Sequence, residues 1–357
     1  MSQQQREAVD TTSPMPSQTG HNMTVPEPAG AAVRIALEEH TLLARPDHIE
    51  RWRSLVPMIP AAIQDELIPR LADTSGRRLE EMDKGGVDLA VLSNVGSVQG
   101  DVDPAAALRL AREANDHLAE VVRARPDRFA AFATTALQDP AAGAGELERA
   151  VTQLGLRGTM LFGQTGGRYL DDPSFDPFWE RAQALNAPVY LHAADAPELP
   201  PSLHGRPELV GATWSWTAET ATHALRIVFG GVLERFPGTR LVLGHLGETL
   251  PFFLWRLDQR ARAFTDRGDH LLPSAQIKRN IHITTSGNFS DDPLSCAISA
   301  LGEDNVMYAV DYPFESMTEA AGWFDAAPLS DAVRVKVAQE NARHLIGLFP
   351  GRSRAQA

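Results

Sequence analysis

The sequence is poor in cysteine, in long apolar runs and in basic runs. Cys296 is the only cysteine, which excludes a disulfide framework and a cysteine-rich zinc site and is typical of a protein of the reducing cytoplasm. No run of about 18 or more uncharged apolar residues is present, so we expect no membrane span. The formal net charge of −13 repels a phosphate backbone and argues against nucleic acid as a partner.

The first 32 residues are rich in Ser, Thr, Gln and Pro and poor in apolar groups. They cannot bury enough apolar surface to offset the entropy of ordering, and they lack the basic and apolar regions of a secretory signal. The chain as a whole is 43% apolar over 357 residues, which suits one α/β barrel with insertions. We therefore expect a disordered tail over residues 1–32 and one barrel domain over residues 33–350.

Short apolar segments alternate with helical patterns along the rest of the chain. This alternation implies parallel strands joined by crossover helices, and eight such units favour a closed (β/α)8 barrel of the TIM type. An open doubly wound sheet is the competing topology, but the Gly-rich phosphate turn that it needs after its first strand is missing. Long connections after the first and fifth strands are expected as insertions. The eight predicted strands cover residues 34–37, 87–92, 129–134, 158–162, 188–191, 240–243, 281–284 and 306–310.

The first predicted strand, in the segment RIALEEH, ends in two carboxylates and an imidazole. Glu38 and His40 are two positions apart, so their side chains point the same way in extended chain, whereas Glu39 points to the other face. This geometry suits two ligands that converge on one metal ion. On this segment alone, a chance charge cluster at a surface strand end is the alternative.

Further polar residues follow the later strands. In a parallel barrel the carboxyl ends of the strands form the functional face, so we expect these residues near Glu38 and His40. Imidazoles and carboxylates suit zinc, manganese or iron, and a site with an open position can also bind water or substrate. The residues at these strand ends are His192, His245, Ser286, Asn288 and Asp311.

His245 lies in a Gly-His-Leu-Gly-Glu turn whose glycines allow a close approach to the site. Glu248 follows three residues later, at an expected helix start, where it can orient His245 and favour its protonated form. The pair is therefore predicted to act in general acid–base chemistry.

Five segments in order carry a resemblance to a known family: RIALEEH, YLHAAD, LGHLGE with the following WRLDQR, ITTSGNF and YAVDYPFE. They resemble the aminocarboxymuconate-semialdehyde decarboxylase-like branch of the amidohydrolase superfamily, and most of all its γ-resorcylate and 2,3-dihydroxybenzoate decarboxylases. The resemblance runs from about Val33 to Leu348. It implies a carbon–carbon lyase, a metal-dependent non-oxidative decarboxylase of a hydroxylated aromatic acid.

The resemblance also implies a metal centre and an assembly. One divalent ion, Zn²⁺ or Mn²⁺, is expected, with no organic cofactor, and a homodimer or homotetramer is the expected assembly. The positions that correspond to the metal ligands are Glu38, His40, His192 and Asp311.

Catalytic roles follow from the same resemblance. His245 with Glu248 corresponds to the catalytic pair, and Asp311 is the expected proton donor to the ring, with His245 polarising the phenol oxygen; the two roles can also be exchanged. Arg256, in WRLDQR, is expected to meet the substrate or a neighbouring subunit.

At two positions the sequence departs from the family pattern, which leaves open which ring substituents of the substrate the protein recognises. His192 is followed by Ala-Ala-Asp where family members often have His-Pro-Arg, and Thr41 stands where an aromatic residue commonly follows the first-strand histidine. The alternative function is a metal-dependent hydrolase or hydratase on the same barrel, acting on a lactone, amide or enol acid with His245 as the base. A binding protein without activity is the third hypothesis.

Overall fold

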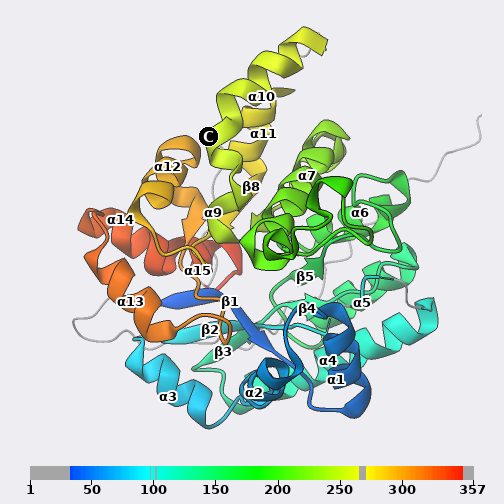
Figure 1. Cartoon of the computed structure of the whole chain (residues 1–357), viewed down its shortest axis with the longest axis vertical. Helices are drawn as coiled ribbons and strands as arrows, with labels where there is room; N and C mark the ends of the chain where they lie inside the picture. Colours follow the sequence, from blue (N-terminus) through cyan, green and yellow to red (C-terminus); the bar gives the residue numbers. More distant parts are fainter. Residues whose placement is uncertain (1–32, 97, 101–102, 265–270, 349–357) are drawn as a thin grey trace, which may run out of the picture.

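Short parallel strands in the middle of the molecule are surrounded by helices (Figure 1). The protein is represented by a computed structural model, which describes residues 33–96, 98–100, 103–264 and 271–348. The tail predicted over residues 1–32, and the last two residues of the barrel domain predicted over 33–350, lie outside this part, so this division stays a prediction. No helix within the described ranges is long and apolar enough to cross a membrane.

The strands follow one another in chain order, and every pair is parallel. One sheet joins β1 to β3 and the other joins β4 to β9. The break between the sheets falls at Phe132, inside the third predicted strand, but the Phe132 N–H still donates to the Leu92 carbonyl at 2.9 Å. The strands of the described residues are β1 (Ile35–Thr41), β2 (Leu89–Asn94), β3 (Phe129–Ala131), β4 (Ala133–Thr134), β5 (Thr159–Phe162), β6 (Val189–His192), β7 (Leu241–Leu243), β8 (Ile281–Thr284) and β9 (Val306–Met307).

Backbone hydrogen bonds between the end of the chain and β1 close the ring of strands. The Leu37 N–H donates to the carbonyl of Tyr308 at 3.2 Å, and the Asp311 N–H donates to the carbonyl of Glu38 at 2.9 Å. Tyr308 and Asp311 both follow β9 directly in the chain. The predicted (β/α)8 barrel is therefore confirmed.

The helices cover the outside of this barrel (Figure 1). Asp103 and Asp139 cap two of them through side-chain bonds to backbone N–H groups, each followed by proline at the first helical position. The α-helices of the described residues are α1 (Pro46–Leu55), α2 (Ala61–Ala72), α3 (Arg77–Lys84), α4 (Pro104–Ala124), α5 (Pro140–Thr152), α6 (Asp176–Ala184), α7 (Ser215–Phe229), α8 (Val232–Arg235), α9 (His245–Glu248), α10 (Leu250–Phe264), α11 (Pro273–Asn280), α12 (Asp291–Leu301), α13 (Met317–Ala326), α14 (Asp331–Val335) and α15 (Asn341–Leu345), with a π-helix η7 (Lys336–Glu340) and short 3₁₀ helices that include η1 (Pro173–Phe175) and η6 (Glu303–Asn305).

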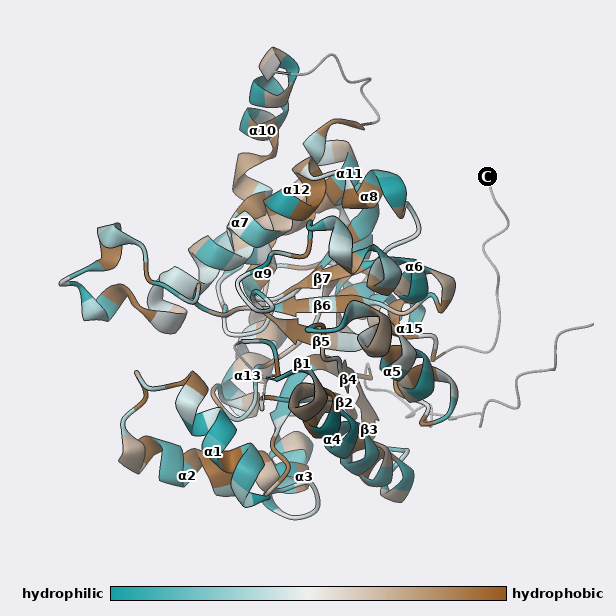
Figure 2. Cartoon of the chain, turned by 90° about the vertical axis from the view of Figure 1, so that its right-hand side faces the viewer, coloured by the Kyte–Doolittle hydropathy of each residue, from teal (hydrophilic) through white to brown (hydrophobic). Residues whose placement is uncertain are grey.

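Both predicted insertions are present. The connection after β1 contains α1 and α2, and the connection after β6, the fifth strand of the barrel, contains the 3₁₀ turns η2 (Pro201–Leu203), η3 (Pro207–Leu209) and η4 (Gly211–Thr213). Because both follow strand ends, they lie at the functional face of the barrel. Helix α10 projects from the barrel, as the side view in Figure 2 shows.

The core is divided into an inner and an outer part by the strands. Ile35 and Leu37 belong to the cluster that fills the barrel, with Phe132 and Tyr190, whereas Ala36 belongs to the cluster between the strands and the helices. This division follows from the alternation of side chains along a strand. Residues that point inward beyond the last apolar layer therefore meet at the centre of the barrel mouth.

A β-bulge in β1 changes this alternation. Ala36 pairs with Ala90 and Glu39 pairs with Leu92, so β1 has one residue more than β2 between these two pairs. The extra residue lets Glu38 face the barrel centre directly after the inward-facing Leu37. Bulges often redirect a side chain beside a functional site, and here the bulge turns Glu38 and the strand end toward the interior.

Candidate metal centre

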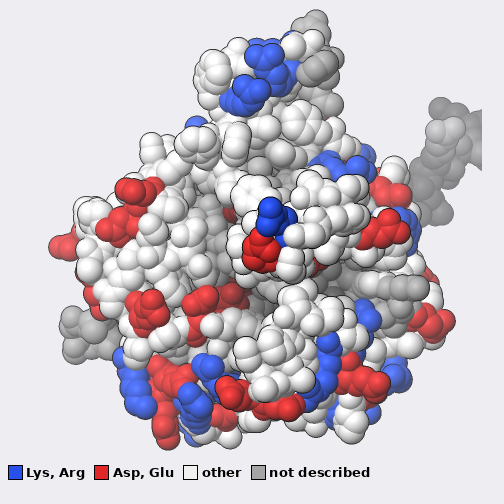
Figure 3. Space-filling model, in the orientation of Figure 1, with Lys and Arg blue, Asp and Glu red and all other residues white. Residues whose placement is uncertain are grey.

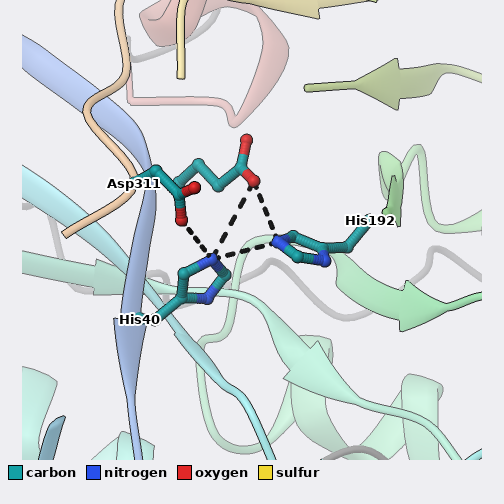
Figure 4. Close-up of side chains that lie close together, drawn as sticks. His40, His192 and Asp311 are labelled. Atoms are coloured by element: carbon teal, nitrogen blue, oxygen red, sulfur yellow. Dashed lines mark hydrogen bonds and ion pairs between the residues drawn. The ribbon is translucent and has the colours of Figure 1, made fainter. Parts of the chain in front are cut away.

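The four residues predicted as metal ligands lie together at the mouth of the barrel (Figure 4). Their donor atoms are all within 4.8 Å of one another. His192 Nε2 is 3.0 Å from Glu38 Oε1 and 3.1 Å from His40 Nε2. His40 Nε2 is also 3.0 Å from Asp311 Oδ1. Since zinc-type ligands lie about 2.0–2.3 Å from their ion, this spacing suits one coordination shell.

The donor set fits a cation because two of its oxygens lack other partners. Glu38 Oε1 and Asp311 Oδ1 are buried, and neither has a hydrogen-bond partner within the described chain. The far nitrogens of the imidazoles are occupied: His40 Nδ1 contacts Ser93 Oγ at 3.0 Å, and His192 Nδ1 donates to the Ala193 carbonyl at 2.8 Å. Such outer contacts fix the ring orientation and direct Nε2 toward the centre.

The two carboxylates of this cluster favour their negatively charged forms, as a cation site requires. Burial alone would raise the pKa of Glu38, but the nearby His245 and His192 outweigh it and lower this pKa. Burial likewise opposes ionisation of Asp311, but the adjacent imidazoles of His245 and His40 outweigh it and bring the pKa of Asp311 below the ordinary value. Both carboxylates are therefore ionised, and a bound cation would neutralise them.

A second group of possible ligands, Asp47, His48 and Glu113, is a weaker candidate. Arg45 Nη1 lies 3.1 Å from Glu113 Oε2, and Arg109 Nη1 lies 3.3 Å from Asp47 Oδ2. The two guanidinium groups already neutralise the two carboxylates, so little attraction is left for a divalent ion. We therefore interpret this group as an ion-pair network.

His245 and Glu248 form the pair that the sequence predicted. His245 Nδ1 is 2.7 Å from Glu248 Oε1, and its Nε2 faces Asp311 Oδ2 at 3.7 Å and Glu38 Oε1 at 3.8 Å. Burial lowers the pKa of His245, but the charges of Glu248 and Glu38 overcome it and raise this pKa well above its ordinary value. The pair therefore favours a protonated imidazole beside the predicted metal ligands.

The backbone that presents this pair is unusual. His245, Leu246, Gly247, Glu248 and Thr249 all have φ between 50° and 81°, so α9 is a left-handed turn. Regular helix begins at Leu250 in α10, two residues after Glu248 and therefore close to the expected helix start. Only glycine adopts this left-handed conformation without strain. Asp311 is also left-handed, with φ of 83°. Strained backbone of this kind is concentrated at functional sites.

Glu39 points away from the cluster, as predicted. Its Oε1 accepts a hydrogen bond from the Val310 N–H at 3.0 Å, and its Oε2 accepts one from the Tyr312 N–H at 3.3 Å. Burial raises the pKa of Glu39 to about 8, against the opposing effect of the Val310 bond. Glu39 thus fastens the backbone on both sides of Asp311.

A cavity of about 750 Å³ adjoins the cluster. His245 and Asp311 lie in its wall together with Asn288, and Trp216 and Phe252 supply apolar surface. A cavity with aromatic walls and a few convergent polar groups suits a small aromatic ligand. Arg256 does not line this cavity: it is exposed on α10, so a single chain does not bring it to the site.

Sequence reasoning missed three residues that contact the predicted ligands. Ser93 contacts His40, while Tyr190 and Thr284 contact the outer oxygen of Glu38. A signal was present for Tyr190, because it precedes His192 by two positions on β6 and so shares its face. Read alone, an apolar strand with one tyrosine predicts only core packing.

The chain is similar to known proteins over most of its length. Residues 48–348 match the amidohydrolase family. The chain belongs to this family. It is 40% identical over 334 residues to the γ-resorcylate decarboxylase of Rhodococcus jostii (strain RHA1), covering 88% of this chain and 98% of that protein. The resemblance to amidohydrolase-type decarboxylases is therefore confirmed.

Two solved structures of this family share the fold closely. One is 2,6-dihydroxybenzoate decarboxylase in complex with 2,6-dihydroxybenzoate, with a TM-score of 0.81, 37% identity, and coverage of 89% of this chain and 100% of that one. The other is a dihydroxybenzoic acid decarboxylase from Polaromonas sp. JS666 with bound manganese and 2-nitroresorcinol. Its TM-score is 0.82 at 36% identity, with 89% and 98% coverage.

Proposed function

We propose that this protein is a carbon–carbon lyase that removes the carboxyl group of an ortho-hydroxybenzoate without oxidation and with a divalent metal ion. The observation that carries the proposal is the cluster of Glu38, His40, His192 and Asp311 beside an aromatic-walled cavity. The similarity to γ-resorcylate decarboxylase over 88% of the chain supports it. We take 2,6-dihydroxybenzoate as the first substrate, since a similar structure binds it.

In this proposal the cluster of four holds one ion. Mn²⁺ is the first candidate for this ion, because the Polaromonas relative contains manganese. Zn²⁺ is the second candidate, because it suits the same mixed ligand set. When bound, the ion supplies a positive charge that orients the carboxylate and neighbouring phenolate of the substrate and stabilises their negative charge. No organic cofactor enters the proposal.

The side chains of the cavity supply the proton that the reaction needs. A proton is added to the ring carbon that carries the carboxylate, the bond to the carboxylate breaks, and its electron pair restores the aromatic ring as CO₂ leaves. We assign delivery of this proton to Asp311, which lies in the cavity wall, with its supply assigned to His245 at 3.7 Å. Glu248 orients His245 through the 2.7 Å contact.

We also propose that the protein acts as a homodimer or homotetramer of cytoplasmic barrels. Phe252 and Trp255 on α10 are 78% and 74% exposed, an unusual amount of aromatic surface beside a cavity. Basic side chains gather at the projecting end of the same helix (Figure 3). A second copy covering this face would bury both aromatic groups, and Arg256 would then meet that subunit or the substrate.

The direct test is CO₂ release by metal-loaded protein. Protein reconstituted with Mn²⁺ should convert 2,6-dihydroxybenzoate to resorcinol and CO₂, and a panel with the 2,3- and 2,4-isomers should define the ring substituents accepted. Absence of CO₂ from all three acids would contradict the proposal. Incorporation of ¹⁸O from water without CO₂ would instead favour the hydrolase or hydratase alternative.

A further inference from the structure

Three hydroxyl groups surround one oxygen of Glu38. Tyr190 and Ser286 donate hydrogen bonds to Glu38 Oε2, and Thr284 Oγ1 lies 3.3 Å from the same oxygen. All four side chains are fully buried. The other oxygen, Oε1, has no hydrogen-bond partner within the described ranges and faces His192 Nε2 at 3.0 Å. The two oxygens of this carboxylate therefore have different environments.

The hydroxyl protons can be assigned because each group carries only one. Tyr190 donates to Glu38, which leaves its oxygen free to accept from Thr284 Oγ1 at 2.8 Å. Ser286 donates to Glu38 and accepts the backbone N–H of His245 at 3.1 Å. Hydrogen bonds to an ionised carboxylate are stronger than neutral ones. Oε2 thus has two charge-assisted donors, and Ser286 connects Glu38 to the backbone of His245.

The barrel places these groups by its regular alternation of side chains. Tyr190 on β6 and Thr284 on β8 both point into the barrel, as Glu38 does after the bulge in β1. Gly244, which follows β7, leaves the space that they need: a Cβ there would lie 2.8 Å from Glu38 Oε2 and 3.1 Å from Ser286 Oγ. Four strands therefore contribute to the surroundings of one carboxylate oxygen.

We infer that Tyr190 and Ser286 are positioning residues that hold Oε2 of Glu38, with Thr284 acting through Tyr190, so that only Oε1 is offered to the metal ion. The inference rests on the metal centre of the proposed function. A purely structural role for Tyr190 predicts that loss of its hydroxyl leaves metal affinity unchanged, because the ring alone fills the barrel beside Phe132, with 6.0 Å between the ring centroids. Removing only the hydroxyl separates the two roles.

Loss of a donor would free Glu38 to turn, so that its orientation toward the ion is no longer fixed. Outer partners of metal ligands typically change metal affinity by about 10–100-fold when they are removed. The effect should appear in metal binding itself, before any substrate is present. It should also be graded, with Tyr190 and Ser286 ahead of Thr284, which donates its proton to Tyr190 and lies 3.3 Å from Glu38 Oε2.

The experiment titrates metal-free protein with Mn²⁺ and measures free Mn²⁺ by electron paramagnetic resonance. Tyr190→Phe and Ser286→Ala should each raise the Kd for Mn²⁺ about tenfold or more. The matched control is Tyr308→Phe, because the Tyr308 hydroxyl is buried and has no partner among the described residues. It should bind Mn²⁺ as the wild type does. Thermal unfolding of each metal-free variant reports on the fold.

A second pair of variants distinguishes the loss of a hydroxyl group from a loss of the fold. Thr284→Val removes the hydroxyl at constant shape and should weaken Mn²⁺ binding, whereas Thr284→Ser keeps the hydroxyl and should bind more tightly than Thr284→Val. Folded Tyr190→Phe and Ser286→Ala proteins with wild-type affinity would overturn the inference. Wild-type protein that binds no Mn²⁺ would overturn the metal centre together with it. Tight binding without decarboxylation would overturn only the proposed reaction.

Discussion

The Nε2 atoms of His40 and His192 lie 3.1 Å apart at the ends of β1 and β6 (Figure 4). Both rings are buried, and each has its Nδ1 atom engaged elsewhere. A single shared proton could satisfy this pair of nitrogens but would leave Glu38 Oε1 and Asp311 Oδ1 without hydrogen bonds. A cation would be attracted to all four atoms at once, so this contact supports the proposed metal centre.

The first prediction concerns this cluster. His192→Ala and Asp311→Ala should each lose bound Mn²⁺ or activity while keeping the barrel, because the core that forms the fold lies below the strand ends. Metal content measured by mass spectrometry and unfolding followed by circular dichroism test the two parts. His344→Ala, at an exposed position of α15, is the control and should keep both. Loss of structure with unchanged metal content would point to a structural role instead.

The second prediction separates charge from geometry in the proposed catalytic pair of His245 and Glu248. Glu248→Gln can still accept a hydrogen bond from His245 Nδ1 but has no negative charge to stabilise the imidazolium. We expect kcat to fall about 100-fold or more, as for loss of general acid–base catalysis, with Mn²⁺ affinity unchanged. Steady-state kinetics of the fully metal-loaded variant provide the measurement. A wild-type kcat would remove Glu248 from the mechanism.

The third prediction concerns the space beside Glu38. Gly244→Ala places a methyl group 2.8 Å from Glu38 Oε2, closer than carbon and oxygen can pack, so either the carboxylate or β7 must move. We expect weaker Mn²⁺ binding and a lower Tm. Gly145→Ala, on the exposed side of α5 with no atom within 4 Å of the new Cβ, should leave binding unchanged. Equal Mn²⁺ affinity in the two variants would contradict the expected steric conflict between the new methyl group and Glu38.

The fourth prediction tests the assembly. Trp255→Glu puts a charge on the exposed aromatic face of α10, so it should shift the protein toward monomers in light scattering after size-exclusion chromatography. Ala124→Glu adds the same charge at an exposed position of α4 and should not. If Arg256 meets the substrate in the assembly, Arg256→Ala should raise KM without changing the oligomer. Monomeric wild-type protein would contradict the proposed assembly.

The positions of the ligands along the chain were predictable, but the way they are held was not. Buried parallel strands appear as apolar runs, so polar residues at their ends, such as His192 and Asp311, could be assigned to one face of the barrel. The bulge in β1 depends on pairing with β2, and the left-handed turn at His245 depends on contacts such as the bond to Ser286. The bulge therefore has no local sequence signal. The glycines beside His245 indicate a turn, but its left-handed course results from tertiary structure.

The last prediction uses His223, a buried histidine of α7 that is remote from the metal ligands in the chain. His223 Nε2 accepts a hydrogen bond from the Leu170 N–H at 2.9 Å, so the ring must be neutral at this nitrogen. Tyr169 packs edge-on against it, with 5.0 Å between ring centroids. Burial, with a smaller effect of the Arg226 charge, lowers the pKa of His223 to about 3. Protonation would therefore destroy a buried hydrogen bond.

Stability should depend on pH through this group with a definite sign. Between the lowered pKa of about 3 and the ordinary value of 6.5, the unfolded chain binds a proton at His223 that the folded chain does not. The free energy of unfolding therefore falls as the pH is lowered below 6.5, by about 3 kcal/mol from this group at pH 4. His223→Gln can keep an acceptor for Leu170 and does not titrate. In urea unfolding of metal-free protein, the free energy of unfolding of this variant relative to the wild type should therefore increase as the pH falls. A difference that stays constant with pH would show that His223 does not titrate as the burial implies.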